Sequence, residues 1–242
     1  MNVAAETPSE EAFSAQIRGM FDRIAGVYDL MNTVMTAGLH HRWRERAADL
    51  DALGPGDSAL DACCGTGDLA LELARRTGSE GTVIGSDFSE PMLDLAREKA
   101  LGRGVAGVRF EWADVLALPY EDQSFDAVTV GFGVRNLADL AAGVEELSRV
   151  LRPGGRLVIL EITQPRRPPL STFYSLWFDR LVPALGVLAG DREAYSYLPE
   201  SVKRFPSPAG LAAVMDRAGL ARIRYVILAG GIIAIHSGTR PG

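Results

Sequence analysis

Cysteine and long apolar runs are scarce in this sequence of 242 residues. The two cysteines, Cys63 and Cys64, are adjacent, so they build neither a disulfide framework nor a zinc site of four spaced ligands. The longest stretch without a formal charge, Tyr225–Thr239, is shorter than the about 20 apolar residues of a membrane-spanning helix. The first residues also lack the basic and apolar segments of a signal peptide. We therefore expect a cytoplasmic protein without a metal, for which peripheral contact with a membrane stays open.

Positive charge is scarce as well. Lys and Arg number 25 against 31 Asp and Glu, which gives a net charge of −6. Binding to a nucleic-acid backbone rests on clustered cations, so we expect no nucleic acid as a partner. Apolar residues make up 47% of the chain and aromatic residues 7%, which suits a single helix-rich domain of ordinary size.

Short apolar segments alternate with helical segments through most of the chain. The expected strands are Ala59–Ala62, Thr82–Ser86, Val108–Trp112, Phe125–Val130 and Arg156–Glu161, and the expected helices between them are Leu69–Arg76, Pro91–Ala100 and Leu137–Leu151. This alternation predicts β-α-β units and a parallel sheet. At the end, Ile223–Leu228 and Ile232–His236 flank Gly230-Gly231 and predict an antiparallel hairpin.

The remaining segments surround this α/β sheet within one domain, 13–242. We expect a flexible tail over residues 1–12 and N-terminal helices over 13–51. The sheet core then covers 52–163, a helical insertion covers 164–210, and a last helix with the hairpin covers 211–242.

A glycine-rich turn follows the first expected strand. Gly65, Gly67 and Ala70 fit a relaxed dinucleotide-binding pattern, and Asp87 lies twenty residues beyond Gly67, at the end of the next strand. Such a turn lets a ligand approach the backbone at the carboxyl edge of the sheet, where Asp87 can accept both hydroxyls of an adenosyl ribose. Two kinds of cofactor fit: a nicotinamide or flavin dinucleotide, and S-adenosylmethionine.

Acidic residues around the turn favour S-adenosylmethionine. Asp61 and Asp68 flank the turn, and Asp68 stands in the first helical turn, where a pyrophosphate would need the backbone N–H groups. S-adenosylmethionine has no phosphate and carries a sulfonium and an ammonium group, which carboxylates attract. Asp114 follows the third strand, where the adenine amino group would lie. A simple helix cap would explain Asp68, but it does not explain acids at successive strand ends.

Three stretches closely resemble the C-methyltransferases of quinone biosynthesis, which methylate the ring of demethylmenaquinol or of a polyprenyl-methoxy-benzoquinol. They are Tyr28–Trp43, which is specific to that family, Phe132–Asn136, and Arg149–Thr163. The similar region runs from about Arg18 to the final hairpin and includes Tyr195–Ser201. The resemblance implies a class I S-adenosylmethionine-dependent methyltransferase, with a Rossmann-like α/β fold, a mainly parallel sheet, a C-terminal antiparallel hairpin and a helical insertion.

The resemblance also implies a cofactor site. Carried over by position, the family's cofactor contacts fall on Thr66, Asp87, Asp114 and Val115. Together with the glycine turn and the strand ends, the expected site comprises Asp61, Gly65, Thr66, Gly67, Asp87, Phe88, Asp114, Val115 and Gly131. Gly131 stands where some members have a cofactor-contacting serine, so that side-chain contact is lost here.

Methylation of a hydroquinone ring begins with removal of a phenolic proton, whose pKa is about 10 by analogy with tyrosine. A ring carbon of the phenolate then attacks the methyl group in line with the sulfur. Arg135 follows the fourth strand and can stabilise the phenolate or hold a water, and Asn136 can orient a ring oxygen. Tyr28 can close over the cofactor, and His40 has a suitable pKa for a proton acceptor.

Each of these catalytic candidates has a structural alternative. Arg135 also fits a surface ion pair, and Asn136 fits the cap of the following helix. Tyr28 fits simple packing, and a histidine within a helix such as His40 is often structural.

Aromatic and aliphatic side chains gather in Ser171–Leu188, inside the insertion. We expect a lid in which Phe173, Trp177 and Phe178 contact a prenyl tail; the alternative is a buried helix that covers the sheet edge. The predicted function is therefore methylation of a lipid-tailed quinol, demethylmenaquinol, with S-adenosylmethionine as cofactor. The alternatives are the benzoquinol of ubiquinone synthesis, a soluble aromatic or polyketide acceptor, and an inactive cofactor-binding subunit. A homo-oligomer is compatible with the sequence.

Overall fold

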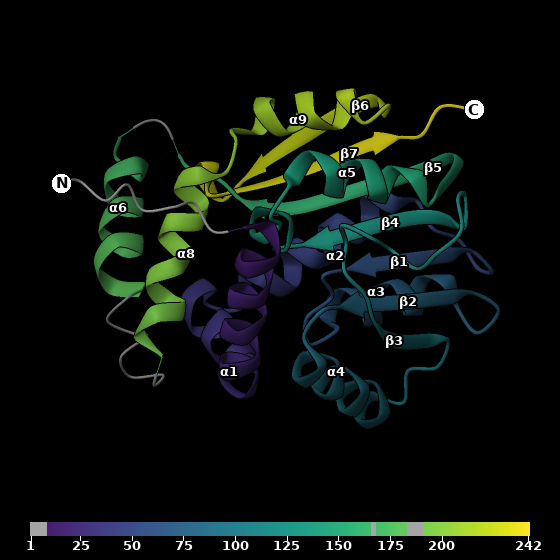
Figure 1. The fold of residues 1–242 in the computed structure, drawn as a ribbon, viewed down its shortest axis with the longest axis horizontal. Helices are drawn as coiled ribbons and strands as arrows, with labels where there is room; N and C mark the ends of the chain where they lie inside the picture. The colour runs from purple at the N-terminus through teal and green to yellow at the C-terminus, as the bar shows by residue number, and fades with distance from the viewer. Residues whose placement is uncertain (1–8, 166–167, 183–190) are drawn as a thin grey trace.

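A seven-stranded sheet in the order β3-β2-β1-β4-β5-β7-β6 forms the centre of the molecule (Figure 1). The structure is a computed structural model that describes residues 9–165, 168–182 and 191–242. The strands are β1 Ser58–Ala62, β2 Thr82–Asp87, β3 Val108–Trp112, β4 Phe125–Gly131, β5 Leu151–Ile162, β6 Ala221–Leu228 and β7 Ile233–Thr239. β1 to β5 run parallel, and β7 lies antiparallel between β5 and β6. The predicted parallel sheet with a terminal antiparallel hairpin is confirmed.

The described helical segments are α1 Glu10–Thr36, α2 Leu39–Asp51, α3 Asp68–Thr77, α4 Glu90–Arg103, η1 Val134–Asn136, α5 Leu140–Arg149, α6 Leu170–Leu176, η2 Trp177–Leu181, α8 Arg192–Arg204, α9 Pro208–Arg217 and η3 Ala229–Gly231. α1 begins within the segment 1–12 that the sequence suggests as a tail, because Ser9 caps it by accepting the N–H of Ala12. α5 begins at Leu140 rather than Leu137, because Asp139 accepts the N–H groups of Ala141 and Ala142. None of the described helices is long and apolar enough to cross a membrane.

Side chains alternate along β1 and serve two separate cores. Leu60 faces the core that α5 and α9 cover, together with Leu147 and Met215. Ala59 faces the core that α2, α3 and α4 cover, and by alternation Asp61 points to the same side. As a result, the side chain of Asp61 at the end of β1 lies under α2.

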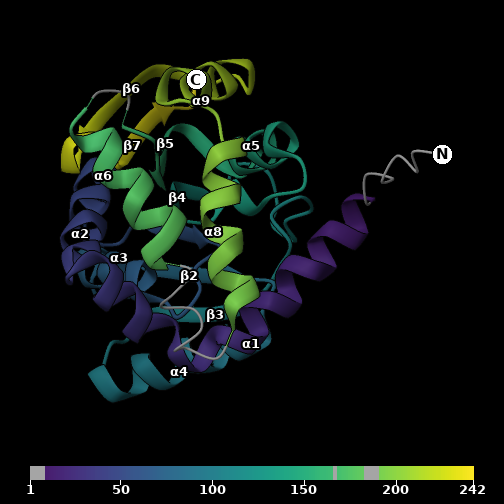
Figure 2. The same ribbon diagram turned by 90° about the vertical axis from the view of Figure 1, so that its left-hand side faces the viewer.

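A third layer lies across the carboxyl ends of the parallel strands. There α1 crosses the sheet edge, and α6 and α8 stand beside it (Figures 1 and 2). Met20 and Ile24 of α1 pack with Phe178 and with Tyr195 of α8. The N-terminal helices and the insertion therefore meet over the edge of the sheet where the glycine turn lies.

Candidate active site

The glycine turn after β1 has backbone angles that are unfavourable for residues with a side chain. Cys63, Gly65 and Gly67 all have left-handed backbones, with φ of 52°, 54° and 81°. A Cβ atom on Gly67 would also lie 2.8 Å from the ring of Phe110 and 2.9 Å from the Cβ of Ala96. Gly67 is therefore required both by its backbone angle and by its close packing, which keeps the turn flat against the sheet.

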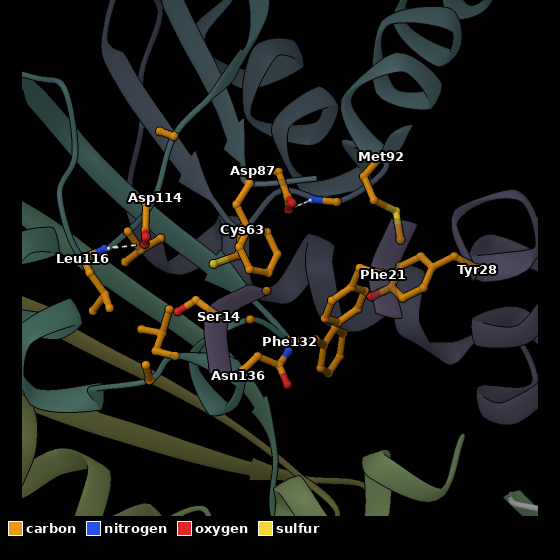
Figure 3. Close-up of a pocket in the computed structure, with 18 residues that line it drawn as sticks. Ser14, Phe21, Tyr28, Cys63, Asp87, Met92, Asp114, Leu116, Phe132 and Asn136 are labelled. Carbon is orange, nitrogen blue, oxygen red and sulfur yellow. Dashed lines mark hydrogen bonds between the residues drawn. The ribbon is translucent and has the colours of Figure 1, made fainter. Parts of the chain in front are cut away.

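Asp87 ends β2 and fixes the turn. Its carboxylate accepts the N–H of Gly65 at 2.8 Å (Figure 3). It also accepts the N–H of Ser89 at 3.0 Å. Burial raises the pKa of Asp87 to about 6, although these backbone donors oppose the rise. Each carboxylate oxygen has a second lone pair, so Asp87 can accept further hydrogen bonds from a ligand.

Past Asp87, the cleft continues along the ends of β2 and β3. Asp114 accepts the N–H of Leu116 at 2.9 Å, and Val115 is buried beside it. Phe88 lies beside Phe21 of α1, with ring centroids 6.4 Å apart. All of these residues line one cleft together with Gly65, Asp87 and Gly131. The structure thus brings most of the expected cofactor residues to one continuous surface.

Asp61 is buried at the end of β1, with 1% of its surface exposed. One carboxylate oxygen accepts the hydroxyl of Thr129 at 2.8 Å, and the other, Oδ2, has no hydrogen-bond partner among the described residues. Burial raises the pKa of Asp61 to about 7. An unpartnered oxygen on a buried acid is costly for the folded protein, and a cationic ligand would relieve that cost.

Thr66 and Asp68 are engaged in a network with α1 and α4. The Thr66 hydroxyl donates to Asp29 at 2.6 Å and accepts from Lys99 at 2.9 Å. Lys99 also pairs with Asp68 at 2.9 Å and with Asp29 at 2.7 Å. Burial alone would raise the pKa of Asp68, but Lys99 holds it below its ordinary value. The charge of Asp68 is thus offset within the protein, so the unbalanced negative charge at the turn comes from Asp61 and Asp87.

The segment after β4 is strained and interlocks with the glycine turn. Phe132 has a φ of 65°, which is rare for a bulky residue and occurs mainly where function requires it. A Cβ atom on Gly133 would lie 2.4 Å from the Cβ of Cys63. Asn136 ends η1, and its buried Oδ1 has no hydrogen-bond partner among the described residues. Because Asp139 caps α5, the cap alternative for Asn136 is wrong.

Arg135 forms a buried ion pair rather than a surface one. Its Nη1 donates to Glu161 at 2.7 Å and to the carbonyl of Phe132 at 2.6 Å, and the two side chains are only 7% and 1% exposed. Burial raises the pKa of Glu161, and the guanidinium opposes that rise. The Nε of Arg135 has no partner among the described residues. The pair therefore holds a cation at the end of β4 whose buried Nε donor is unused.

His40 has both ring nitrogens engaged. Arg44 can only donate, so Nδ1 of His40 accepts from it and Nε2 carries the hydrogen. Nε2 then donates to Thr33 at 3.2 Å, and the Thr33 hydroxyl donates to the carbonyl of Asp29 at 2.8 Å. Burial lowers the pKa of His40 to about 4. His40 therefore has no free lone pair to accept a proton from a substrate. Instead, it holds the guanidinium of Arg44 in place.

A second, larger cavity of about 420 Å³ opens beside the cofactor cleft. Its lining is mostly apolar and comes largely from α1, α2, η2 and α8, and it also includes Arg135 and Asn136. Trp177 and Phe178 lie on its wall, and Phe178 stacks on Tyr174 with ring centroids 4.3 Å apart. The side chain of Phe173 and residues 183–190 lie outside the described part of the chain.

The cleft and the cavity share one wall. It consists of Phe21, Tyr28, Phe132 and Asn136, each of which lines both spaces. Tyr28 also lines a small third pocket beneath the turn. A ligand in the cleft and another in the cavity would therefore both contact this wall.

Three features of the site were not predicted from the sequence. Arg44 of α2 is buried beside Asp61, Glu161 pairs with Arg135, and Tyr195 and Tyr197 of α8 line the cavity. For Glu161 a signal exists, since a charge directly follows the buried run Leu157–Leu160 at the cofactor edge. The burial of Arg44 depends on how α2 packs, which local sequence does not reveal.

The fold is that of the class I S-adenosylmethionine-dependent methyltransferases. A solved structure of a SAM-dependent methyltransferase from Aquifex aeolicus superposes with a TM-score of 0.61 over 81% of this chain and 88% of that one, at 21% identity. The [4+2]-cyclase SpnF superposes with a TM-score of 0.64 over 83% and 80% of the two chains, at 20% identity. Because that neighbour is named for a cyclisation, the fold alone does not fix the reaction.

Sequence comparison identifies the family. Residues 9–240 match the ubiE/COQ5 methyltransferase family, and the chain belongs to it. A demethylmenaquinone methyltransferase from Thermus thermophilus is 49% identical over 92% of this chain and 100% of the relative. One from Desulfitobacterium hafniense is 44% identical over 94% and 91%. A ubiquinone/menaquinone biosynthesis C-methyltransferase from Teredinibacter turnerae is 38% identical over 97% and 95%. The predicted family and methyltransferase activity are confirmed.

Proposed function

We propose that this methyltransferase transfers a methyl group from S-adenosylmethionine to a ring carbon of demethylmenaquinol, which yields menaquinol. The observation that carries the proposal is the shared wall, where an acidic cleft meets an apolar cavity of about 420 Å³. An acidic cleft suits a cationic donor, and an apolar cavity suits a quinol with a prenyl tail. The relatives from Thermus thermophilus and Desulfitobacterium hafniense are named demethylmenaquinone methyltransferases.

The residues present fit the cofactor. Asp87 has lone pairs left for the ribose hydroxyls, Asp114 and Val115 lie where the adenine would extend, and Asp61 has an unpartnered oxygen for the ammonium group. When bound, S-adenosylmethionine supplies an electrophilic methyl group on a sulfonium. The cleft reaches the wall at Tyr28 and Asn136, so these side chains would border the transferred methyl group.

Arg135 and Asn136, which both line the cavity, suit a hydroquinone. The unpartnered Oδ1 of Asn136 can accept one ring hydroxyl, which orients the ring. The buried guanidinium of Arg135 can stabilise the negative charge that develops on the other ring oxygen. When bound, the methyl donor would supply the methyl group to a ring carbon and leave as S-adenosylhomocysteine, and one proton would pass to solvent for each methyl group transferred. His40 supports this site through Arg44 rather than as the base.

A side-by-side methyl-transfer assay tests the proposed acceptor. We expect demethylmenaquinol to be methylated faster than a tail-less naphthol, because the cavity adds apolar contact along the tail. The benzoquinol precursor of ubiquinone is the second candidate, because relatives such as the one from Teredinibacter turnerae are named for both pathways. Activity on soluble phenols with none on prenylated quinols would refute the quinone proposal.

Replacing Asp87 with alanine is expected to weaken binding of S-adenosylmethionine by about 1.5–3 kcal/mol, the range for hydrogen bonds to charged groups. The reason is that two ribose hydroxyls lose their acceptor. Isothermal titration calorimetry measures the change, and Asp94→Ala on the exposed face of α4 is the matched control. Unchanged affinity would remove Asp87 from the cofactor site, and we expect no binding of NADH by either variant.

The Trp177→Ala variant is expected to lose activity on a long-tailed quinol far more than on a tail-less analogue. Trp177 lines the apolar cavity, and each prenyl CH₂ in contact with it contributes up to about 0.8 kcal/mol. The measurement is kcat/KM for both acceptors with the wild type and the variant. Equal losses on both acceptors would mean that Trp177 only packs the core.

A further inference from the structure

Apolar side chains are exposed at the corner where α1 turns into α2. Leu30 and Val34 lie one helical turn apart on α1 and are 64% and 49% exposed, and Leu39 at the start of α2 is 43% exposed. Ala37 between the helices is exposed as well. Ala37 and Gly38 have left-handed backbones, which reverse the chain at this point. We call Leu30, Val34, Ala37 and Leu39 the α1–α2 corner.

The apolar cavity opens at the α1–α2 corner. Val34, Ala37 and Leu39 line the cavity although they are exposed to solvent. A side chain that borders a cavity and is also exposed lies at the rim of an opening. Arg135 and Asn136 line the same cavity, so a quinol ring held by them can extend its prenyl tail toward this rim.

The charge of the α1–α2 corner differs from that of the whole chain. The net charge of the chain is −6, yet Leu30–Arg44 contains neither Asp nor Glu, and Arg42 is exposed in the first turn of α2. Of the two acids that bound this stretch, Asp29 pairs with Lys99 at 2.7 Å, and Glu45 is exposed. Exposed apolar side chains beside a cation suit a lipid surface with anionic head groups.

We propose that the α1–α2 corner docks on a membrane that contains anionic lipids, so that the prenyl tail passes from the bilayer into the cavity. The apolar side chains would enter the boundary between head groups and acyl chains, while Arg42 meets lipid phosphates. The tail would then reach the cavity without exposing its apolar surface to water. This inference rests on the proposed quinol substrate and names the side of the enzyme that faces the lipid.

Co-sedimentation of the full chain with vesicles measures the docking without substrate or cofactor. Vesicles of phosphatidylcholine mixed with anionic phosphatidylglycerol are compared with vesicles of phosphatidylcholine alone. Leu30→Ser combined with Leu39→Ser should weaken binding to the mixed vesicles at least about 10-fold, because two apolar side chains no longer enter the lipid. Arg42→Gln should weaken binding to the mixed vesicles about fivefold and leave binding to phosphatidylcholine unchanged.

The matched control is Ile227→Ser on β6. Ile227 is 44% exposed, as Leu39 is, but it lies on the face of the sheet that α9 covers. Two residues before it, Tyr225 stacks on His236, which bonds the carbonyl of Pro208 at the start of α9. This variant should bind both kinds of vesicle within twofold of the wild type.

Three results would overturn the proposal. The first is no binding of the wild type to the mixed vesicles, and the second is equal loss in Ile227→Ser and in the double variant. The third is a wild-type dimer that the double variant dissociates without lipid, which would make the corner an interface between copies. Should the double variant fail to fold, Leu30→Ser alone replaces it, with a loss of about threefold or more expected.

Failure of the proposed function would be recognised separately, because the vesicle assay contains no acceptor. Docking through the α1–α2 corner without methylation of demethylmenaquinol would refute the substrate and leave the membrane surface in place. Methylation of demethylmenaquinol by a chain that binds no vesicles would refute the docking alone.

Discussion

Replacing Arg135 with methionine is expected to lower kcat about 100- to 1,000-fold with little change in cofactor affinity. The guanidinium is the cation that stabilises the phenolate, and removal of one such preorganised donor typically has this effect. The same change strands the buried carboxylate of Glu161, so we also expect a loss of about 3–5 kcal/mol in the free energy of unfolding.

A double variant separates the two effects. Arg135→Met with Glu161→Gln removes the stranded charge, so the stability should largely return while kcat stays low. The matched control is Arg152→Met, because Arg152 pairs with Asp126 at the same distance of 2.7 Å but is 46% exposed. That variant should change the unfolding free energy by less than about 1 kcal/mol and leave kcat unaltered. Return of activity in the double variant would reduce Arg135 to a structural partner of Glu161.

Asp61→Asn is expected to stabilise the ligand-free protein while it weakens binding of S-adenosylmethionine. The pKa of Asp61 is about 7 in the folded protein and about 3.9 in the unfolded chain. Between these values the folded state binds the proton more tightly, so the wild type loses stability as the pH rises from 4 to 7. Asparagine does not titrate, so the variant avoids that loss of stability. Above pH 7 its free energy of unfolding should exceed that of the wild type by roughly 4 kcal/mol at most.

Urea unfolding of the ligand-free variants at pH 4, 6 and 8 measures this effect. The difference between Asp61→Asn and the wild type should be near zero at pH 4 and largest at pH 8. Asp216→Asn, on the exposed surface of α9, serves as the control and should show no such trend. A constant difference at all three pH values would mean that Asp61 does not titrate in this range.

The sheet and the cofactor edge were predictable because they follow local rules. Buried strands that alternate with helices predict a parallel sheet, and an acid directly after such a strand, as at Asp87, must lie at its carboxyl edge. Asp61 and Asp114 follow from the same rule. The rule does not predict the ion pair between Asp68 and Lys99, because that pair depends on how α3 packs against α4.

The N-terminal helices were harder to interpret for a physical reason. His40, Arg44 and Asp51 of α2 are buried at positions i, i+4 and i+11, a spacing that apolar residues normally occupy. Which face of α2 is buried depends on how the helix packs against the sheet, so the burial of these polar residues could not be predicted from local sequence. Similarly, the bond between Asp29 and Thr66 joins residues far apart in the chain, and no periodicity predicts it.

Helix α1 borders both binding spaces, the cofactor cleft and the apolar cavity. Ser14, Phe21 and Tyr28, spaced by seven residues, line the cofactor cleft, and the last two also line the apolar cavity. The bonds of Asp22 to Ser89 and of Asp29 to Lys99 hold the helix in place. A movement of α1 that opened one space would therefore open the other as well. The affinities of donor and acceptor would then be thermodynamically linked, so that each ligand would change the affinity of the other by the same factor.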